Sequence, residues 1–240
     1  MSPLQDLADR LRDGLLARHD LTEVGAPYET LTLLETGQAV GVVRVWTGDT
    51  IPKLVDSRLV VPALEIDSVM LHAFAPTDSA VPHLGSDVAG IEGRFSFNLD
   101  LTPRVDLALE PSYIDTVYEP MTTARNAAYA IEGAEPVDIP LRLRAFSSPW
   151  IVGVNVTEEQ LPHVERAYDE FLGHFSALLA TGVATGPSAD LAARDRAQRR
   201  AQYDPASDEV WDFLASILGQ SSVDVILELI RDPGPATPRP

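Results

Sequence analysis

The feature that most constrains the fold is a succession of short, β-rich runs in the first half of the chain. They are "GVVRVW" (41–46), "RLVVPALEI" (58–66), "SVMLHAF" (68–74) and "RFSFNLDL" (94–101), and Gly, Pro, Asp and Ser separate them. None of the segments between them has the pattern of a helix long enough to cross over between parallel neighbours. The pattern therefore predicts an antiparallel meander.

Helical patterns lie at both ends of the chain. Leucines recur every three to four residues over 3–17, which predicts an amphipathic helix. Thr157 precedes a second apolar pattern as a helix N-cap, so we predict a helix over 158–180. The polar, Arg-rich stretch 191–202 and the apolar pair 208–218 and 222–230 complete the predicted helices.

Between these regions we predict a strand pair, "IPLRLRAF" (139–146) and "WIVGVNV" (150–156), and a loop over 182–190. Strands in the middle and helices at the ends predict an α+β fold, a three-layer α/β/α sandwich with a central antiparallel sheet flanked by helices. We expect one domain over 1–231 and a Pro-rich, disordered tail over 232–240.

Composition excludes several classes of function. The chain has 240 residues, a formal net charge of −18 and no cysteine, and Lys53 is its only lysine. The charge argues against nucleic-acid binding. The lack of cysteine excludes disulfides, a thiol nucleophile and thiolate-held zinc or iron–sulfur clusters. The N-terminus lacks the plan of a signal peptide and no apolar run reaches membrane-spanning length, so we expect a cytoplasmic protein without a membrane segment.

Familiar ligand motifs are absent. The sequence contains no GxGxxG after a strand, no P-loop and no HExxH, and its histidines are far apart without metal-ligand spacing. We therefore expect no intrinsically bound metal or nucleotide cofactor. Gly85, Gly90 and Gly93 bracket Asp87 with a spacing that fits a hairpin turn better than a phosphate cradle.

One long stretch carries a resemblance to known proteins. "VPHLGSDVAGIEGRFSFNLDLTP" (81–103) resembles the central motif of the ferredoxin-dependent bilin reductases. Its continuation, "DLTPRVDLALEPSYIDTVYE" (100–119), is similar to a segment of red chlorophyll catabolite reductase, a relative in the same superfamily, and "LRLRAFSSP" (141–149) extends that similarity. "SDEVWDFLASILG" (207–219) is similar to a C-terminal segment of the bilin reductases.

The resemblance implies an α/β/α sandwich that holds an open-chain tetrapyrrole between its sheet and its C-terminal helices. It also implies single-electron reduction by ferredoxin with no metal or flavin of the chain's own. Asp87 matches the sheet-borne catalytic acid, Asp208 the acid of the C-terminal region, and Arg144 a strand arginine that pairs with a substrate propionate. His72 lies near a catalytic histidine of some members, but the alignment slips there by one residue, which would reverse its face.

The chemistry of the reaction agrees with these residue types. A reduced tetrapyrrole must take protons at defined carbons, so acids must lie within hydrogen-bond reach of it. Burial raises the pKa of a carboxylic acid and lets it keep a proton near pH 7. Arginine suits a propionate because its planar fork binds both oxygens.

Each assignment has a structural alternative. Asp87 is also typical of an Asx-type turn, Asp208 of a helix N-terminus, and Arg144 of an exposed strand residue. Asp100 has the pattern of an acid that caps a turn at the end of a strand. Arg194, Arg196, Arg199 and Arg200 are the best candidate for a basic patch that binds ferredoxin, although a solvated helix face is an equal reading.

We therefore predict an oxidoreductase that reduces a C=C bond of a linear tetrapyrrole with electrons from ferredoxin, acting on CH–CH groups by a radical mechanism. Asp87 and Asp208 are the predicted proton donors, Arg144 the substrate contact and His72 a further participant. The main alternative is a non-catalytic protein that binds or carries a linear tetrapyrrole. An enzyme acting on another conjugated substrate and a ligand-free interaction domain are the remaining readings.

Overall fold

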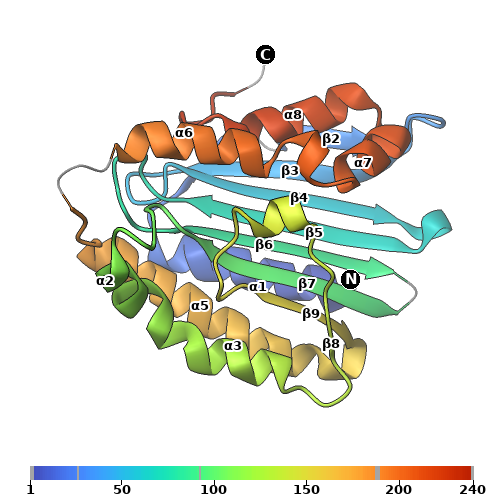
Figure 1. The fold of residues 1–240 in the computed structure, drawn as a ribbon. Coiled ribbons are helices and arrows are strands. Elements are labelled where there is room, and N and C mark those ends of the chain that lie inside the picture. Colours follow the sequence, from blue (N-terminus) through green and yellow to red (C-terminus); the bar gives the residue numbers. More distant parts are fainter. Residues whose placement is uncertain (1–2, 26, 92, 187–189, 239–240) are drawn as a thin grey trace.

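The central element of the fold is one antiparallel sheet. The structure, a computed structural model, describes residues 3–25, 27–91, 93–186 and 190–238. Within these ranges the sheet has nine strands in the order β1-β3-β4-β5-β6-β7-β9-β8, and β2 also pairs with β3. Helices cover both of its faces (Figure 1). The predicted three-layer α/β/α sandwich is confirmed.

Long neighbouring strands form the meander predicted from the sequence. Each pairs antiparallel with the next along the chain, and β7 pairs with β9 across a long connection. Short strands complete the two edges. The bounds are β1 Thr22–Glu23, β2 Glu29–Thr32, β3 Ala39–Thr47, β4 Lys53–Val61, β5 Ile66–Phe74, β6 His83–Ile91, β7 Arg94–Thr102, β8 Glu135–Pro136 and β9 Val152–Thr157.

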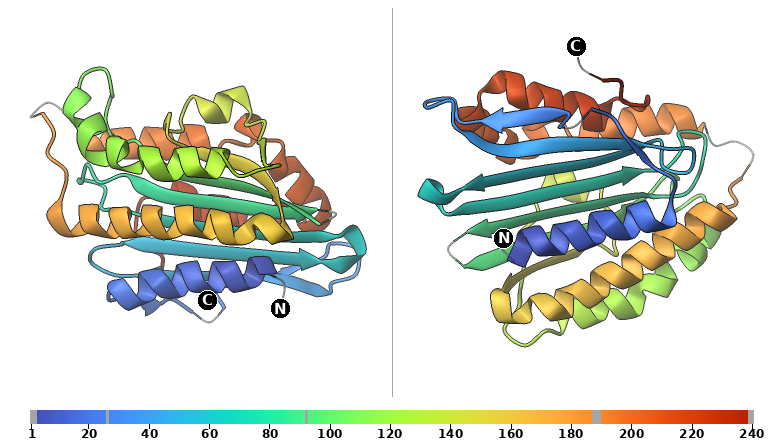
Figure 2. Two further views of the ribbon diagram at one scale, coloured as in Figure 1. Left: turned by 90° about the horizontal axis from the view of Figure 1, so that it is seen from below. Right: turned by 180° about the vertical axis from the view of Figure 1, so that it is seen from behind.

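One face of the sheet packs against α1 (Pro3–Arg18), α3 (Thr122–Tyr129) and α5 (Leu161–Thr181), which run across it in Figure 2. The apolar stripe of α1 and alternate side chains of the strands form one core on this side, with Phe97 and Phe175 at its centre. Thr157 begins the α5 segment with a capping box to Gln160, as the sequence predicted. This layer supports the strands through apolar packing.

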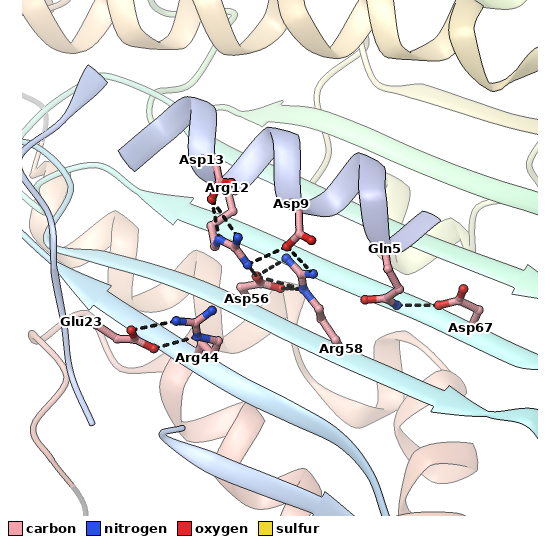
Figure 3. Close-up of polar contacts among 9 residues, drawn as sticks. All are labelled: Gln5, Asp9, Arg12, Asp13, Glu23, Arg44, Asp56, Arg58 and Asp67. Carbon is pink, nitrogen blue, oxygen red and sulfur yellow. Dashed lines mark hydrogen bonds and ion pairs between the residues drawn. The ribbon is translucent and has the colours of Figure 1, made fainter. Parts of the chain in front are cut away.

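Ion pairs attach α1 to β4, an interior strand of the sheet (Figure 3). Arg58 of β4 binds both Asp9 of α1, at 2.8 Å, and Asp56, at 2.7 Å. Arg12 of α1 lies 2.8 Å from Asp9 and 3.6 Å from Asp56. Because Asp56 is fully buried, these arginines supply the positive charge that its carboxylate needs.

The other face is covered by α6 (Leu191–Gln202), α7 (Val210–Leu218) and α8 (Gln220–Arg231). A second core lies beneath them and includes Phe74, Tyr203 and Trp211. Lys53 is buried here, and its Nζ donates to the carbonyl oxygens of Leu229 and Asp232 at 3.0 and 2.8 Å. The chain's only lysine thus fastens the end of α8 to the sheet.

The alternative reading of Asp87 as a turn residue is wrong, because Asp87 lies at the middle of the continuous strand β6. It pairs with Met70 of β5 and with Asn98 of β7. The spacing of the glycines is typical of a turn, but Gly85 and Gly90 are strand residues. Only Gly93, with φ of 75°, has the backbone conformation of a turn, at the start of the connection into β7.

The strand predicted over 139–146 is also wrong. Residues Leu141–Arg144 form the short helix α4, in which the Arg144 N–H donates to the carbonyl oxygen of Pro140 at 2.9 Å. The alternation of Leu and Arg resembled a half-buried strand, but Leu141 is 83% exposed and contributes nothing to the core. The edge position beside β9 belongs to β8 instead.

Several helical turns lie in the connection between β7 and β9, where the sequence predicted none. They are α2 (Pro111–Tyr113), a π-helical turn (Ile114–Tyr118), a 3₁₀ turn (Glu119–Met121) and α3. The remaining 3₁₀ turns are Pro62–Leu64, Glu158–Gln160 and Pro205–Ser207. Of the predicted loop 182–190 and tail 232–240, residues 187–189 and 239–240 lie outside the described residues. No helix among those described is long and apolar enough to cross a membrane.

Candidate active site

A cavity of about 390 Å³ lies between the sheet and the C-terminal helical layer. Its floor is formed by β5, β6 and β7, and its other walls come from α7, the end of α6 and the segment around α4. This volume is in the range of small-molecule sites. The polar floor residues are Ser68, His72, Asp87, Ser96, Asn98, Asp100 and Thr102, and the other walls include Ile139, Pro140, Leu143, Ser147, Ile151, Tyr203, Asp208, Trp211 and Leu214.

The polarity of the floor follows from the alternation of β7. Ser96, Asn98, Asp100 and Thr102 share one face of this strand and line the cavity. Phe95, Phe97, Leu99 and Leu101 share the other face and enter the core beneath α5. A strand that is covered on both sides has no need of a polar face for solubility, so this stripe indicates a site for a ligand with polar groups.

Three of the predicted site residues meet in this cavity: His72, Asp87 and Asp208. His72 lies on β5 opposite Gly85 of β6, and its Nε2 is 3.0 Å from Asp87 Oδ1. The register thus turns His72 toward the cavity, which the sequence alone left open. The Asp87 side chain is 53% exposed toward this space, so it is less buried than the sequence-based reading implied.

The other ring nitrogen of His72 has a partner from the helical layer. The hydroxyl oxygen of Tyr203, directly after α6, lies 2.9 Å from His72 Nδ1, and the two rings are 5.3 Å apart. Burial, with the negative charge of Asp87 second, raises the pKa of Tyr203 well above its ordinary value. The phenol therefore keeps its proton, and Tyr203, His72 and Asp87 form one hydrogen-bonded chain that ends in the cavity.

Asp208 faces the cavity from the opposite wall, between the 3₁₀ turn Pro205–Ser207 and α7. Its Oδ1 accepts the backbone N–H of Val210 at 3.0 Å, so the helix-terminus reading of this acid also holds. Burial raises the pKa of Asp208, and the nearby charges of Asp87 and Glu209 add to the effect. The negative charge of Asp87 therefore acts on Asp208 across the cavity, and Asp208 holds a proton more readily than an ordinary aspartate.

Asp100 is an acid of the site that sequence reasoning missed. It is buried on the floor of the cavity and accepts hydrogen bonds from the Ser148 backbone N–H at 2.9 Å and from Ser148 Oγ at 2.5 Å. Burial raises the pKa of Asp100 to about 7, against the hydrogen bonds that lower it. The alternating polar stripe of β7 was the signal that could have identified Asp100 as a cavity residue rather than a turn cap.

Arg144 does not lie where the sequence placed it. It is an exposed residue of α4 and not a strand residue, and it is not among the described residues that line the cavity. Leu143, its neighbour on the same helix, does line the cavity. The helix therefore turns one side chain inward and leaves Arg144 outside the rim.

The predicted basic patch on α6 also needs correction. Arg194, Arg196 and Arg200 are exposed, but Arg199 is only 2% exposed and its guanidinium lies 3.9 Å from the centre of the Phe74 ring. The four-residue helical period explains the mistake, because it turns Arg199 and Asp195 toward the sheet while their neighbours face solvent. Arg199 is a buried residue and no part of a surface patch.

Arg199 belongs to a second, closed cluster of charges. Asp195 Oδ1 lies 2.6 Å from His83 Nε2, and the Asp195 carboxylate also lies 3.1 Å from Arg199 and 3.5 Å from Arg104. Burial acts to raise the pKa of Asp195, but the hydrogen bond from His83 and the two arginines outweigh it and lower the pKa. Burial lowers the pKa of His83 well below 6.5, and the charges of Arg104 and Arg199 add to this. The pair is a neutral histidine beside an ionised aspartate.

Comparison with known proteins gives a structural relative. No protein-family model and no curated protein matches this sequence. Among solved structures, the phytochromobilin synthase from tomato in complex with biliverdin is similar, with a TM-score of 0.74 over 98% of this chain and 86% of that chain. The chain has the fold of phytochromobilin synthase. The sequence identity is 13%, so this likeness establishes the fold, and the chemistry of the cavity must be argued from its own residues.

Tyr203 is the residue of the site with no local signal in the sequence. It is 131 positions from His72 along the chain, and nothing in "AQYDPAS" indicates a contact with a strand histidine. Only the packing of α6 over β5 brings the two together. A pairing that depends on tertiary packing of this kind could not be found from the sequence.

Proposed function

We propose that this chain is an oxidoreductase that reduces a C=C bond of an open-chain tetrapyrrole with electrons from reduced ferredoxin, in the manner of the bilin and red chlorophyll catabolite reductases. The observation that carries the proposal is the meeting of His72, Asp87 and Asp208 in one cavity. This cavity belongs to a fold shared with the tomato phytochromobilin synthase, whose structure contains biliverdin. A cytoplasmic location remains part of the proposal.

The reaction needs two electrons and two protons for each reduced double bond. Ferredoxin delivers the electrons singly, and each addition makes the pigment basic enough to take a proton from a nearby acid. Asp87 and Asp208 lie on different walls of the cavity and are the proposed donors to the two carbons. His72 binds Asp87 directly and is the proposed path by which that acid is recharged.

Asp100 gives the site a third protonatable carboxyl. With a pKa of about 7 it is partly protonated at neutral pH. A protonated carboxyl can donate a hydrogen bond to a pigment carbonyl, and Asn98 beside it on the same face of β7 offers an amide. These floor residues are the proposed contacts for the polar edge of the tetrapyrrole.

The propionates of a bilin would extend beyond the walls of the cavity. Arg144 remains the proposed propionate partner, reached at the rim and not from within the sheet. An exposed guanidinium can still bind a carboxylate through two parallel hydrogen bonds, although solvent weakens such a pair. This contact would orient the pigment more than it would add affinity.

Ferredoxin is the proposed partner, and Arg194, Arg196 and Arg200 are its proposed contacts on the exposed side of α6. Tyr203 directly follows this helix and its side chain reaches His72, so a donor docked on α6 would lie close to the cavity. The net charge of −18 works against an acidic partner, and a local patch must overcome it. This charge is the observation that favours the second candidate, a protein that binds or carries a linear tetrapyrrole without reducing it.

The decisive experiment mixes the purified chain with biliverdin under anaerobic conditions, together with ferredoxin, ferredoxin reductase and NADPH, and follows the long-wavelength absorption of the pigment. Loss or shift of that band only when ferredoxin is present would support the reductase. A spectral change on mixing, with no turnover, would contradict the reductase and support the carrier. No change with biliverdin or other linear tetrapyrroles would contradict both functions.

A further inference from the structure

Tyr203 is held rigidly at the point where the helical layer meets the sheet. Its backbone N–H donates to the carbonyl of Arg199 at 3.1 Å, and its carbonyl accepts two hydrogen bonds from the Arg231 guanidinium at 3.0 and 2.6 Å. The side chain is buried, so its hydroxyl cannot turn to bulk water. The position of the hydroxyl relative to His72 is therefore set by contacts of the Tyr203 backbone with α6 and with the Arg231 side chain of α8.

The hydrogen positions at His72 follow from this contact. Among the described residues, His72 Nδ1 is the only hydrogen-bond partner of the Tyr203 hydroxyl. A buried O–H without an acceptor is costly, so the phenol donates to Nδ1. Nδ1 then carries no proton, and a neutral His72 must carry its hydrogen on Nε2, which faces Asp87 Oδ1 at 3.0 Å.

His83 shows the same arrangement, but the donor to its Nδ1 is a backbone N–H, which cannot act as an acceptor. The backbone N–H of Ala75 donates to His83 Nδ1 at 3.0 Å, and His83 Nε2 donates to Asp195 at 2.6 Å. An amide N–H can only donate, so His83 has its hydrogen on Nε2. At His72, the hydroxyl of Tyr203 replaces the amide in the same role.

The charges around His72 favour its protonated form, and the Tyr203 hydroxyl opposes them. Asp87 on β6, Asp208 before α7 and Asp100 on β7 line the same cavity, and each carboxylate favours a positively charged imidazole. The cations on this side, Arg199 on α6, Lys53 on β4 and Arg231 on α8, are bound to other partners. An imidazolium at His72 would carry a hydrogen on Nδ1 and force the hydroxyl of Tyr203 to turn away from its only acceptor.

We propose that Tyr203 is a positioning residue that holds His72 in the neutral form with its hydrogen on Nε2, so that His72 donates a hydrogen bond to Asp87. This inference deepens the proposed function and rests on it for its meaning in catalysis. Asp87 Oδ1 accepts from His72, which leaves the second carboxyl oxygen to carry the proton that the pigment takes. Without the hydroxyl, Nδ1 would have no fixed donor, and His72 would no longer be held in that form.

The test is ¹⁵N NMR of the histidine rings in the whole chain without pigment. In the wild type at pH 7, His72, assigned from the signals that vanish in His72→Gln, should show a protonated Nε2 and an unprotonated Nδ1. In Tyr203→Phe the ratio of imidazolium to neutral His72 should rise about tenfold, as expected from a lost hydrogen bond to a buried group. An unchanged ratio, or a wild type with its hydrogen on Nδ1, would overturn the inference.

A matched control removes another buried phenol hydroxyl. Tyr168 binds Ser86, the neighbour of Asp87 on β6, from the opposite face of the sheet. Tyr168→Phe should leave the His72 signals unchanged, and a shift as large as that of Tyr203→Phe would overturn the specific role of Tyr203. The wild-type spectrum decides the tautomer even if Tyr203→Phe folds poorly. Since no pigment is used, failure of biliverdin reduction would contradict the proposed function and leave the result at His72 intact.

Discussion

The molecule contains two histidine–aspartate pairs of nearly the same design on the same face of the sheet. In both, a donor binds Nδ1 and a carboxylate faces Nε2. Yet the Asp87 side chain is 53% exposed toward the cavity, whereas the side chain of Asp195 is 1% exposed and held between Arg104 and Arg199. One pair can exchange a proton with a ligand, and the other is sealed.

The different exposure of Asp87 and Asp195 shows that a histidine–aspartate hydrogen bond does not by itself make a catalytic group. The closed pair is fixed by a backbone amide and two guanidinium groups, so changing its charge would leave buried cations unpaired. The open pair is fixed by one phenol hydroxyl and has acids on the other walls. Access and the sign of the neighbouring charges separate a structural pair from a reactive one.

The largest effect should come from breaking the open pair. Asp87→Asn keeps the shape of the side chain but removes the proton donor, so ferredoxin-dependent turnover of biliverdin should fall by about 10²- to 10⁴-fold. Its free energy of unfolding should change by less than about 0.5 kcal/mol, because the side chain is half-exposed. Stopped-flow absorption measures the turnover rate, and urea unfolding measures the stability.

The control is Asp169→Asn, on the exposed face of α5. Equal turnover rates in Asp87→Asn and Asp169→Asn would remove Asp87 from the mechanism.

Breaking the closed pair should affect folding instead. Asp195→Asn leaves the buried guanidinium groups of Arg104 and Arg199 without a carboxylate, which should lower the free energy of unfolding by about 3–5 kcal/mol. Urea unfolding at pH 7 measures the loss. Arg196→Gln, one residue along on the solvent side of α6, should change stability by less than about 0.5 kcal/mol. A loss at Asp195→Asn as small as that would show that the cluster is not a structural support.

The smallest effect concerns the pH dependence of the closed pair. The pKa of His83 is lowered in the fold, so below pH 6.5 the unfolded histidine takes a proton that the folded one does not, and stability falls as the pH falls. Between pH 6.5 and 5.5 the wild type should lose up to about 1.4 kcal/mol more than His83→Gln. Asp100 works in the opposite direction over the same range because its pKa is raised, and the comparison of two chains cancels it. If the free energy of unfolding of the wild type and of His83→Gln changed equally with pH, the neutral assignment of His83 would be contradicted.

Much of the architecture could be predicted because it depends on local periodicity. The two-residue alternation of the long strands and the 3.6-residue periods of α1 and α5 are visible in the sequence. The errors have physical causes. Glycines at 85 and 90 hid β6, since they are typical of turns but are also tolerated in a strand whose neighbours supply the packing. At 141–144 the alternation came from an exposed helical turn and not from a pleated strand.

The site was harder to predict than the fold. Asp87, His72 and Asp208 were found through resemblance, and the structure brings them together in one cavity. The sequence pattern predicts Asp100 as a turn cap, whereas the structure places it in the polar stripe of β7 that lines the cavity. Tyr203, Asp195 and the burial of Arg199 depend on how α6 docks over β5 and β6, and no local pattern encodes that docking.

The single lysine offers a chemical handle of another kind. Lys53 is buried, and desolvation lowers the pKa of its amine to about 8. Its Nζ donates hydrogen bonds to two backbone carbonyl oxygens. An amine-reactive label can reach this side chain only when α8 lifts from the sheet. The rate of Lys53 modification would therefore report the opening of the helical layer that covers the cavity, without any engineered tag.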